Sequence, residues 1–318
     1  MNASPAGPST TSAGPRPADA TLSWVDRAPA ASRPFLRLAR ADRPIGSWLL
    51  VIPCWWSTAL AAHMSGAGWT AWSLALLALF AVGSIAMRGA GCTWNDILDR
   101  DIDGRVERTR ARPIPSGQVS PRGAFAFLVV QALAGLLVLL TLPRFAIFTA
   151  LASLGVVAIY PLMKRVIWIP QLVLGLAFSW GALMGFATLM EALPAAALLL
   201  YAGSVLWVVG YDTIYAHPDR EYDALIGVKS SARLFGRSTH GWLVALYAGT
   251  ALLIGAAIAS AGGGVIAYAG LAAFAAHLAW QIRRLDIDDP ALCLAVFRSN
   301  RDAGLILFAA FALQAAVG

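Results

Sequence analysis

Three aspartates, Asp96, Asp99 and Asp103, stand at positions i, i+3 and i+7 of one short stretch. A helix through this stretch would turn all three carboxylates to the same side, because residues three or four apart share a helix face. Such an array suits a hard divalent cation, and Mg²⁺ tends to take one or two carboxylates while leaving positions for water and substrate phosphate oxygens. The spacing therefore favours a magnesium-bridged diphosphate site.

A second acidic group follows much later in the chain. Asp219 and Asp223 are four residues apart and Asp212 stands seven residues before Asp219. Pro218 is expected to break or bend the helix between them, since proline lacks the backbone N–H that a helix interior needs. A pair of solvated acidic loops is the alternative explanation. Both groups abut hydrophobic segments and are followed by basic residues, which favours a binding site.

The elements that must position these aspartates are membrane helices. Of the 318 residues, 58% are hydrophobic and 13% are charged, which is too apolar for an ordinary soluble domain. Apolar windows of about 20 residues predict about nine spans, so the fold class is all-α and the chain is a polytopic membrane protein. The predicted spans cover residues 44–62, 69–94, 122–142, 145–163, 167–190, 194–215, 239–260, 264–282 and 301–317.

The basic residues predict how the chain is oriented. With these spans, 22 of the 24 Lys and Arg residues lie on one side, Arg144 lies on the other and Arg88 lies inside a span. The positive-inside rule makes the crowded side cytoplasmic. The N-terminus and both acidic groups then lie on the cytoplasmic side, where the two groups could meet. The formal charge of +7 reflects this topology, and we expect no nucleic-acid partner.

The N-terminal residues 1–32 are rich in Ala, Pro, Ser and Thr and contain no apolar run long enough for a signal peptide. We predict a disordered cytoplasmic tail here and a membrane domain over residues 33–318. Two acidic residues and a modest Arg content argue against a mitochondrial transit peptide, which favours a bacterial inner membrane. The three cysteines show no metal-ligand spacing.

Several basic residues could bind an anionic substrate. Arg108 and Arg112 lie in a Pro- and Gly-rich loop after the first acidic group, where they could neutralise a diphosphate or merely reflect cytoplasmic topology. Arg43, before the first span, could be a snorkelling anchor or an anion ligand. Arg88 is expected to be paired or functional because it lies in a span. It precedes Asp99 by 11 residues, about 16 Å along a helix axis, so both could point into one cavity.

The later half of the chain has a similar order, an acidic group followed by Lys229 and further basic residues. This order suggests a distant duplication with halves at roughly 44–163 and 167–318.

The motifs resemble those of the UbiA superfamily of intramembrane prenyltransferases, and within it the 4-hydroxybenzoate polyprenyltransferases of ubiquinone biosynthesis. The superfamily pattern N-D-x-x-D-x-x-x-D is met at Asn95, Asp96, Asp99 and Asp103, and D-x-x-x-D at Asp219 and Asp223. The subfamily is suggested by MRGAGCTWND, RPIPSG, YPLMKR followed by PQLVLG, and GYDTIYAHPDREYDALIGVKSSARLFG. The resemblance extends from about Arg37 to the C-terminus. Chlorophyll and haem O synthases resemble the first motif about as well.

The resemblance implies helices around a central cavity with a cytoplasmic cap, in the lipid bilayer. It implies Mg²⁺-dependent transfer of a polyprenyl group from polyprenyl diphosphate to 4-hydroxybenzoate, ortho to its hydroxyl, with release of diphosphate. The implied metal ligands are Asp96, Asp99, Asp103, Asp219 and Asp223, of which all but Asp96 are also assigned catalytic roles.

The substrate-binding residues expected with this chemistry are Asn95, Arg43, Arg88, Arg108, Arg112, Lys164, Arg165, Asp212 and Lys229. Most of the basic ones would offset the charge of the diphosphate. By resemblance Arg165 would hold the carboxylate of the acceptor, with Arg43 and Arg88 as competitors, and an Asp of the second group would orient the phenol.

Two alternatives remain open at this point. The first is a prenyltransferase for another acceptor, such as a naphthoate, a homogentisate or a tetrapyrrole. The second is a divalent-cation transporter, which would be expected to carry acidic residues in the middle of its spans. The predicted spans hold almost none there.

Overall fold

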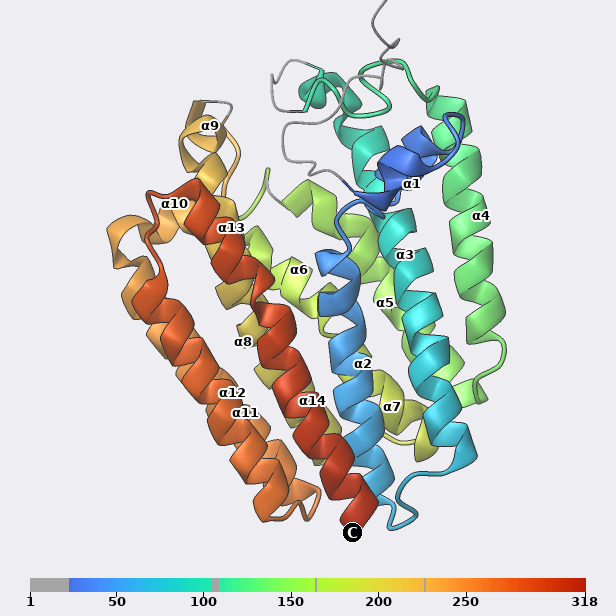
Figure 1. Ribbon diagram of the computed structural model, residues 1–318, viewed down its shortest axis with the longest axis vertical. Coiled ribbons are helices and arrows are strands. Elements are labelled where there is room, and N and C mark those ends of the chain that lie inside the picture. The colour runs from blue at the N-terminus through green and yellow to red at the C-terminus, as the bar shows by residue number, and fades with distance from the viewer. Residues whose placement is uncertain (1–22, 105–108, 164, 226) are drawn as a thin grey trace, which may run out of the picture. The chain divides into compact units, whose positions relative to one another are not determined.

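The computed structural model describes residues 23–104, 109–163, 165–225 and 227–318. Every regular element in these ranges is a helix, as the sequence predicts (Figure 1). The chain forms two compact units, one of residues 1–44 and 89–131 and the other of residues 45–88 and 132–318. The units do not follow the two predicted halves, and the duplication stays a prediction.

The first unit contains a short N-terminal part. Its elements are the 3₁₀ helix η1 (Trp24–Arg27) and the helix α1 (Arg33–Leu38). Two long helices, α3 (Ala71–Asp103) and α4 (Pro121–Leu139), each continue from one unit into the other.

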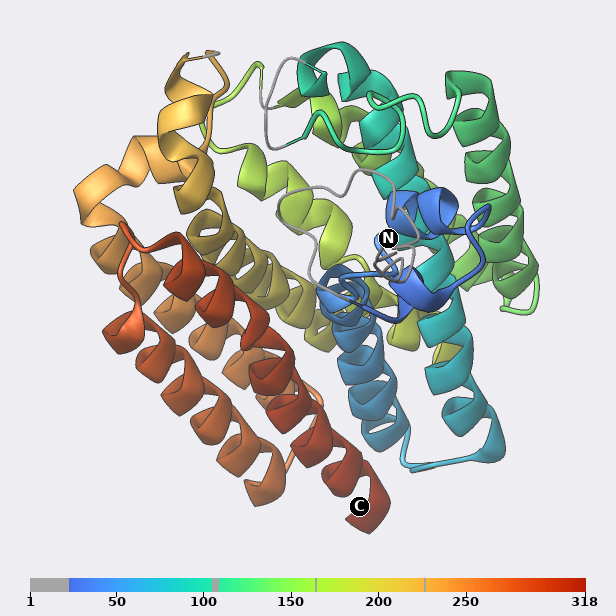
Figure 2. The same cartoon turned by 45° about the horizontal axis from the view of Figure 1, so that its top comes forward.

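The second unit holds the remaining helices. The long ones are α2 (Ile45–Met64), α5 (Arg144–Met163), α8 (Ala195–Ala216), α11 (Thr239–Ser260), α12 (Val265–Arg284) and α14 (Asn300–Val317). The short ones are α6 (Pro170–Phe178), α7 (Gly181–Leu189), η2 (His217–Asp219), α9 (Arg220–Leu225), α10 (Ser231–Phe235), η3 (Gly236–Ser238) and α13 (Pro290–Arg298). Within this unit α8 packs against α11 and α6, and α12 and α14 lie side by side in both views (Figure 1, Figure 2).

Seven helical segments of the described chain are long and apolar enough to cross a membrane: Ile45–Met64, Ala71–Asp103, Pro121–Leu139, Pro170–Leu189, Ala195–Leu225, Ser231–Ser260 and Val265–Arg284. Helix α5 contributes a shorter apolar stretch, Arg144–Tyr160, and α14 is not among the seven. Every predicted span overlaps one helix or a pair of helices. The chain is a polytopic membrane protein, while the predicted number of crossings and their orientation stay predictions.

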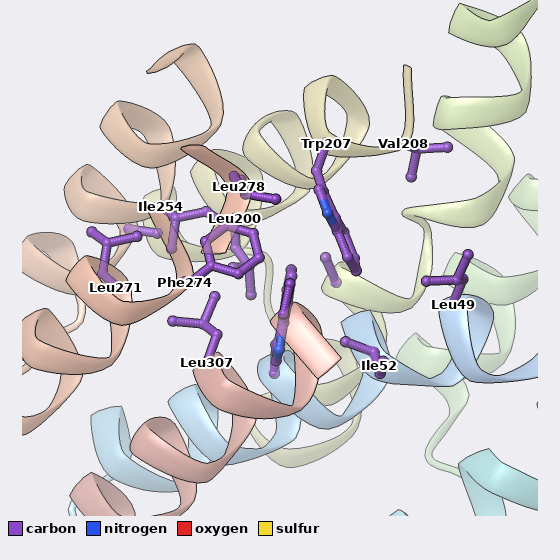
Figure 3. Packing of buried hydrophobic residues seen from close by; sticks show 14 of the residues in the cluster. Leu49, Ile52, Leu200, Trp207, Val208, Ile254, Leu271, Phe274, Leu278 and Leu307 are labelled. Atoms are coloured by element: carbon purple, nitrogen blue, oxygen red, sulfur yellow. The ribbon is translucent and has the colours of Figure 1, made fainter. Parts of the chain in front are cut away.

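Aromatic side chains form the centre of the second unit's core (Figure 3). The rings of Trp56 and Trp207 lie 4.9 Å apart between centroids, and Phe274 lies 5.7 Å from Trp56 and 5.9 Å from Trp207. Each indole N–H has an acceptor: Trp56 Nε1 donates to the carbonyl of Gly304 at 2.8 Å, and Trp207 Nε1 donates to Asn300 Oδ1 at 2.9 Å. These hydrogen bonds allow both indoles to be fully buried.

Small residues let α2 and α7 approach each other closely. A Cβ at Gly185 would overlap the backbone of α2 at Thr58. Ser57 Oγ donates to the carbonyl of Gly181 at 2.8 Å and accepts from the backbone N–H of Gly185 at 2.9 Å. Membrane helices commonly associate through close packing of small residues and hydrogen bonds between helices, because the hydrophobic effect does not drive helices together within lipid.

Structured chain begins earlier than the sequence suggested. Residues 23–32 were assigned to the disordered tail, but η1 forms here and Val25 is completely buried. Asp26 Oδ1 accepts a hydrogen bond at 3.1 Å from Nη2 of Arg37, which is itself buried. This pairing ties η1 to α1, beside a small core of Leu38, Ile114, Val119 and Ala124.

Candidate active site

Helix α3 runs without interruption through the first acidic motif to Asp103. The predicted helical spacing of the three aspartates is therefore confirmed. Asp96, Asp99 and Asp103 are exposed by only 0%, 4% and 6%, and Asn95 is partly buried. Buried carboxylates require partners because the loss of hydration is large.

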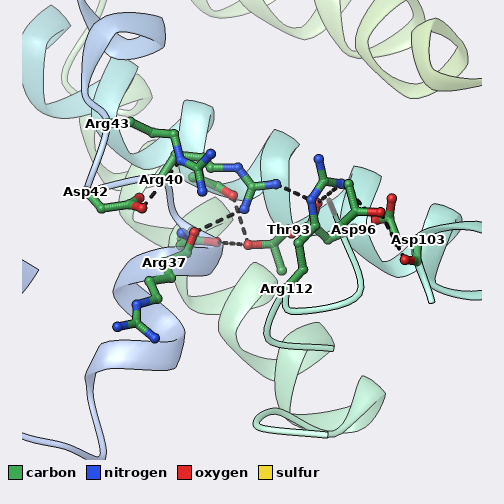
Figure 4. A network of polar contacts seen from close by, with 11 residues as sticks. Arg37, Arg40, Asp42, Arg43, Thr93, Asp96, Asp103 and Arg112 are labelled. Carbon is green, nitrogen blue, oxygen red and sulfur yellow. Dashed lines mark hydrogen bonds and ion pairs between the residues drawn. The ribbon is translucent and has the colours of Figure 1, made fainter. Parts of the chain in front are cut away.

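Two arginines are the partners of Asp96 and Asp103 (Figure 4). Asp96 Oδ1 accepts from Arg40 Nη2 at 2.7 Å and from Arg112 Nη1 at 3.3 Å. Arg112 Nη1 also donates to Asp103 Oδ2 at 2.8 Å. The other oxygen of Asp96, Oδ2, is buried and has no hydrogen-bond partner among the described residues. Arg112 was predicted as a site residue, whereas Arg40 was missed by the sequence analysis.

Residues 109–117 lie against the end of α3 and thereby place Arg112. Thr109 Oγ1 donates to the carbonyl of Asp103 at 2.9 Å, and the N–H of Arg112 donates to the carbonyl of Thr109 at 2.8 Å. The following turn closes through the N–H of Ser116 on the carbonyl of Arg112 at 3.0 Å. Gly117 takes φ 75°, a left-handed conformation that glycine adopts readily. The described part of the Pro- and Gly-rich loop, residues 109–117, is thus closed by turns, as predicted, while residues 105–108 lie outside the described residues.

Two further contacts are made by residues close to this motif. Thr93, one turn before Asp96 on α3, donates from Oγ1 to Gln131 Oε1 on α4 at 3.1 Å. Arg43 lies beside Asp42, with its Nε 3.4 Å from Oδ2. The first contact holds α3 against α4. The second shows that Arg43, a predicted anion ligand, has a carboxylate next to it.

The second acidic motif belongs to the other unit. Helix α8 ends at Ala216, and Pro218 lies in the 3₁₀ helix that follows, so the predicted break is confirmed. Asp219 closes that 3₁₀ helix and Asp223 lies in α9, and both are partly buried. The carbonyl of Asp223 accepts from the N–H of Val228 at 2.9 Å. The two aspartates thus lie on the consecutive short helices η2 and α9 that follow α8.

Lys229 meets the connection between α5 and α6. Its Nζ donates to the carbonyl of Val166 at 2.8 Å and lies 5.7 Å from the ring centroid of Trp168. Arg233 Cζ lies 5.5 Å from the same ring. Arg165, a predicted site residue, is exposed in this connection. The structure thus brings Lys229 close to the segment that contains Arg165, another predicted site residue.

Arg88, the ionisable residue within a span, has partners from three other helices. Its guanidinium Cζ lies 5.2 Å from the ring centroid of Phe178 at the end of α6. Its charge acts on Asp212 of α8. A Cβ at Gly46 of α2 would come within 2.5 Å of Arg88 Nε, so this contact requires glycine. Arg88 thus lies within electrostatic reach of Asp212, a second predicted site residue, and its functional role stays a prediction.

Two predicted site residues, Arg108 and Lys164, lie outside the described residues. In the described part of the chain, no group of three or more His, Cys, Asp and Glu side chains is placed to hold one metal ion. In the first motif the arginines Arg40 and Arg112 hold the carboxylates instead. The assignment of metal ligands therefore stays a prediction.

Comparisons with known proteins agree with the motifs. Residues 50–312 match the model of the UbiA prenyltransferase family. The chain is 48% identical over 282 residues to the mitochondrial 4-hydroxybenzoate polyprenyltransferase of Aedes aegypti, covering 86% of this chain and 62% of that one. It is 48% identical over 289 residues to the protein of the same name from Rattus norvegicus, covering 89% of this chain and 75% of that one.

Solved structures show the same fold. A UbiA homologue from Aeropyrum pernix K1 in its apo form has a TM-score of 0.68 at 25% identity, covering 83% of this chain and 96% of that one. A UbiA homologue from Archaeoglobus fulgidus bound to GPP and Mg²⁺ has a TM-score of 0.65 at 16% identity, covering 90% of this chain and 100% of that one. Together with the buried aspartates of α3 and the match over most of its length, these likenesses mean that the chain belongs to the UbiA prenyltransferase family.

Proposed function

We propose that this chain transfers a polyprenyl group from polyprenyl diphosphate to the ring carbon of 4-hydroxybenzoate next to the hydroxyl-bearing carbon, and releases diphosphate, as a step of ubiquinone biosynthesis. The observation that carries the proposal is the buried row of aspartates at the end of the membrane helix α3, held by arginines. The names of the relatives from Aedes aegypti and Rattus norvegicus support the acceptor. The mosquito relative is matched over 62% of its length.

The proposed cofactor is Mg²⁺, with Asp96, Asp99, Asp103, Asp219 and Asp223 as its ligands. The donor set consists of carboxylate oxygens, which hard cations prefer. The buried Oδ2 of Asp96, which has no hydrogen-bond partner among the described residues, is an oxygen that such an ion would satisfy. When bound, Mg²⁺ would supply positive charge to the leaving diphosphate.

The basic side chains have the complementary task of binding the diphosphate. Arg112 presents a guanidinium at the first motif, and Lys229, which follows Asp223 by six residues, presents an ammonium at the connection between α5 and α6. As the bond between the allylic carbon and the diphosphate oxygen breaks, these cations would stabilise the growing negative charge of the leaving group. The ring carbon of the acceptor would then attack the allylic cation, and loss of the ring proton would restore the aromatic ring.

For the acceptor we propose Arg88 and Asp212. Arg88 lies against Phe178 and acts on Asp212 within the second unit, so an aromatic ring with one anionic end would find both a cation and an apolar face there. Arg165, the residue suggested by resemblance, is exposed, and Arg43 already lies beside Asp42. Arg88 is therefore preferred for the carboxylate and Asp212 for the phenol.

The membrane in which the protein resides is also a proposal. The N-terminal composition favours a bacterial inner membrane with the N-terminus in the cytoplasm. The relatives named above are mitochondrial by name.

Product analysis tests the proposed reaction. Purified full-length protein in liposomes would be given Mg²⁺, a short prenyl diphosphate and either 4-hydroxybenzoate, a hydroxynaphthoate or homogentisate. We expect 4-hydroxybenzoate carrying one prenyl group ortho to its hydroxyl, identified by mass spectrometry and NMR. If product forms only with another acceptor, the prenyl-transfer reaction is retained and 4-hydroxybenzoate is rejected as its acceptor. If folded protein releases no diphosphate with any acceptor, the proposal that the protein is a prenyltransferase is rejected.

A further inference from the structure

Arg40 occupies a backbone position that normally favours glycine. It follows α1 and has φ 57°. The N–H of Ala41 donates to the carbonyl of Leu36 at 2.9 Å, and the N–H of Arg40 donates to the carbonyl of Arg37 at 3.1 Å. This pair of bonds is a Schellman motif, in which the residue at the Arg40 position is left-handed and is usually Gly because a Cβ is disfavoured there.

The side chain at this strained position reaches the first aspartate of α3 (Figure 4). Arg40 Nη2 donates to Asp96 Oδ1 at 2.7 Å, and Nη1 donates to the carbonyl of Arg37 at 3.1 Å. The Arg40 side chain is 14% exposed and that of Asp96 is 0% exposed. Residues in such strained backbone conformations are often found at functional sites. The strain at Arg40, together with its bond to a buried carboxylate, therefore indicates a functional role for the Arg40 side chain.

This contact conflicts with the proposed role of Asp96 as a metal ligand. Oδ2 of Asp96 has no hydrogen-bond partner among the described residues and is open to a metal ion. Oδ1 accepts from both Arg40 and Arg112, and these two guanidinium charges would repel a divalent cation at the same carboxylate. Arg112 has a closer carboxylate in Asp103, at 2.8 Å compared with 3.3 Å to Asp96. Arg112 can therefore leave Asp96 and remain paired with Asp103, whereas Arg40 makes the shorter bond to Asp96 and is the cation whose release would most reduce this repulsion.

We propose that Arg40 is an internal counter-ion of Asp96 that is exchanged for the divalent cation, so that Arg40 sets the metal affinity of the first motif. The inference rests on the proposed function. Without metal, Arg40 neutralises a carboxylate that is too buried to stay charged alone. With metal, the guanidinium is released beside the motif as an additional positive charge. Arg40 is thus a positioning residue that keeps the metal-free site folded.

Direct titration with Mn²⁺ tests this exchange. Purified full-length protein in detergent, without prenyl diphosphate or acceptor, would be titrated while free Mn²⁺ is measured by electron paramagnetic resonance. Arg40→Gln removes the competing charge, and Arg40→Gly also relieves the left-handed backbone. Arg33→Gln is the matched control, because Arg33 lies on α1 and donates from Nε to the carbonyl of Ala28 at 2.7 Å instead of to an aspartate.

We expect both Arg40 variants to bind Mn²⁺ at least tenfold more tightly than the natural protein, and Arg33→Gln to stay within twofold. Thermal unfolding gives the second readout: without metal Arg40→Gln should unfold at lower temperature than the natural protein, and Mn²⁺ should raise its Tm by more. Arg40 variants with unchanged or weaker Mn²⁺ binding would overturn the exchange, as would the absence of binding in every variant.

The outcome is separable from the fate of the proposed function, because no substrate is present in the titration. Turnover of 4-hydroxybenzoate combined with unchanged Mn²⁺ affinity in the Arg40 variants would retain the function and reject the exchange. Tighter Mn²⁺ binding in those variants without turnover by the natural protein would retain the exchange and reject the function.

Discussion

Arg112 joins the two ends of the first aspartate motif, because its Nη1 lies 2.8 Å from Asp103 Oδ2 and 3.3 Å from Asp96 Oδ1. The two carboxylates stand seven residues apart on α3. A single guanidinium from the following loop thus neutralises positions almost two turns apart. The loop and the end of the helix are therefore expected to be stable only together.

Loss of this guanidinium should destabilise the protein. Arg112→Gln leaves Asp103 buried with less positive charge beside it. We expect the free energy of unfolding to fall by about 3 kcal/mol, because a buried charge that loses its ion-pair partner is no longer compensated for its lost hydration. The double variant Arg112→Gln with Asp103→Asn should lose less than the two single variants together. Denaturant titration in detergent without metal measures both. Additive losses would show that the two side chains do not depend on each other.

Removal of Arg88 should impair use of the acceptor more than use of the donor. In Arg88→Gln the acceptor carboxylate loses its cation, so we expect KM for 4-hydroxybenzoate to rise at least tenfold, about 1.4 kcal/mol, with little change in KM for the prenyl diphosphate. For the neutral acceptor 4-hydroxybenzamide, the KM values of the natural protein and the variant should differ much less. Arg88→Lys, which keeps the charge, is the control. An equal rise for both acceptors would contradict binding of the carboxylate by Arg88.

The ring of Trp168 should help to hold Lys229. Trp168→Ala removes a cation–π contact, which is worth about 0.5–1 kcal/mol at exposed sites, so the KM for prenyl diphosphate should rise by about two- to fivefold. Trp168→Phe should restore most of the affinity. Trp280→Ala is a matched control, because Arg284 lies 5.8 Å from the Trp280 ring in a helix without a predicted site residue. An equal rise in the KM for prenyl diphosphate in Trp168→Ala and Trp280→Ala would contradict a role of Trp168 in holding Lys229.

Gly185 should tolerate no side chain. A Cβ there would overlap the backbone of Thr58, so Gly185→Ala must push α2 and α7 apart, at about 1–3 kcal/mol. Gly155→Ala in α5 is the control, because a Cβ at that exposed position meets nothing within 4 Å, and alanine is the better helix former. Thermal unfolding in detergent should show a lower Tm only for Gly185→Ala. Equal melting temperatures would contradict the close packing of α2 and α7.

Local patterns in the sequence were sufficient for much of this architecture. Apolar runs locate the long helices, the i, i+3, i+7 spacing places the aspartates of α3 on one face, and Pro218 marks the end of α8. Each of these features depends on residues that are close in sequence, where helix geometry determines which side chains are neighbours.

Features that depend on distant contacts were not predictable in the same way. Arg40 reaches Asp96 across 56 residues through a turn with a left-handed residue that the sequence does not mark with Gly. Trp168 and Lys229 meet because two connections of the second unit lie together. The start of the structured chain was also placed too late, because the burial of Val25 depends on packing that a polar, Pro-rich stretch does not reveal.

The measurement that tests the central claim most directly is turnover of a short prenyl diphosphate and 4-hydroxybenzoate by the purified protein in liposomes, with and without Mg²⁺, beside Asp99→Asn and Asp219→Asn. The variants remove one carboxylate charge from each motif while keeping its shape. The account predicts Mg²⁺-dependent prenylated 4-hydroxybenzoate from the natural protein and loss of product in both variants. Undiminished product from either folded variant, or product without any divalent cation, would contradict it.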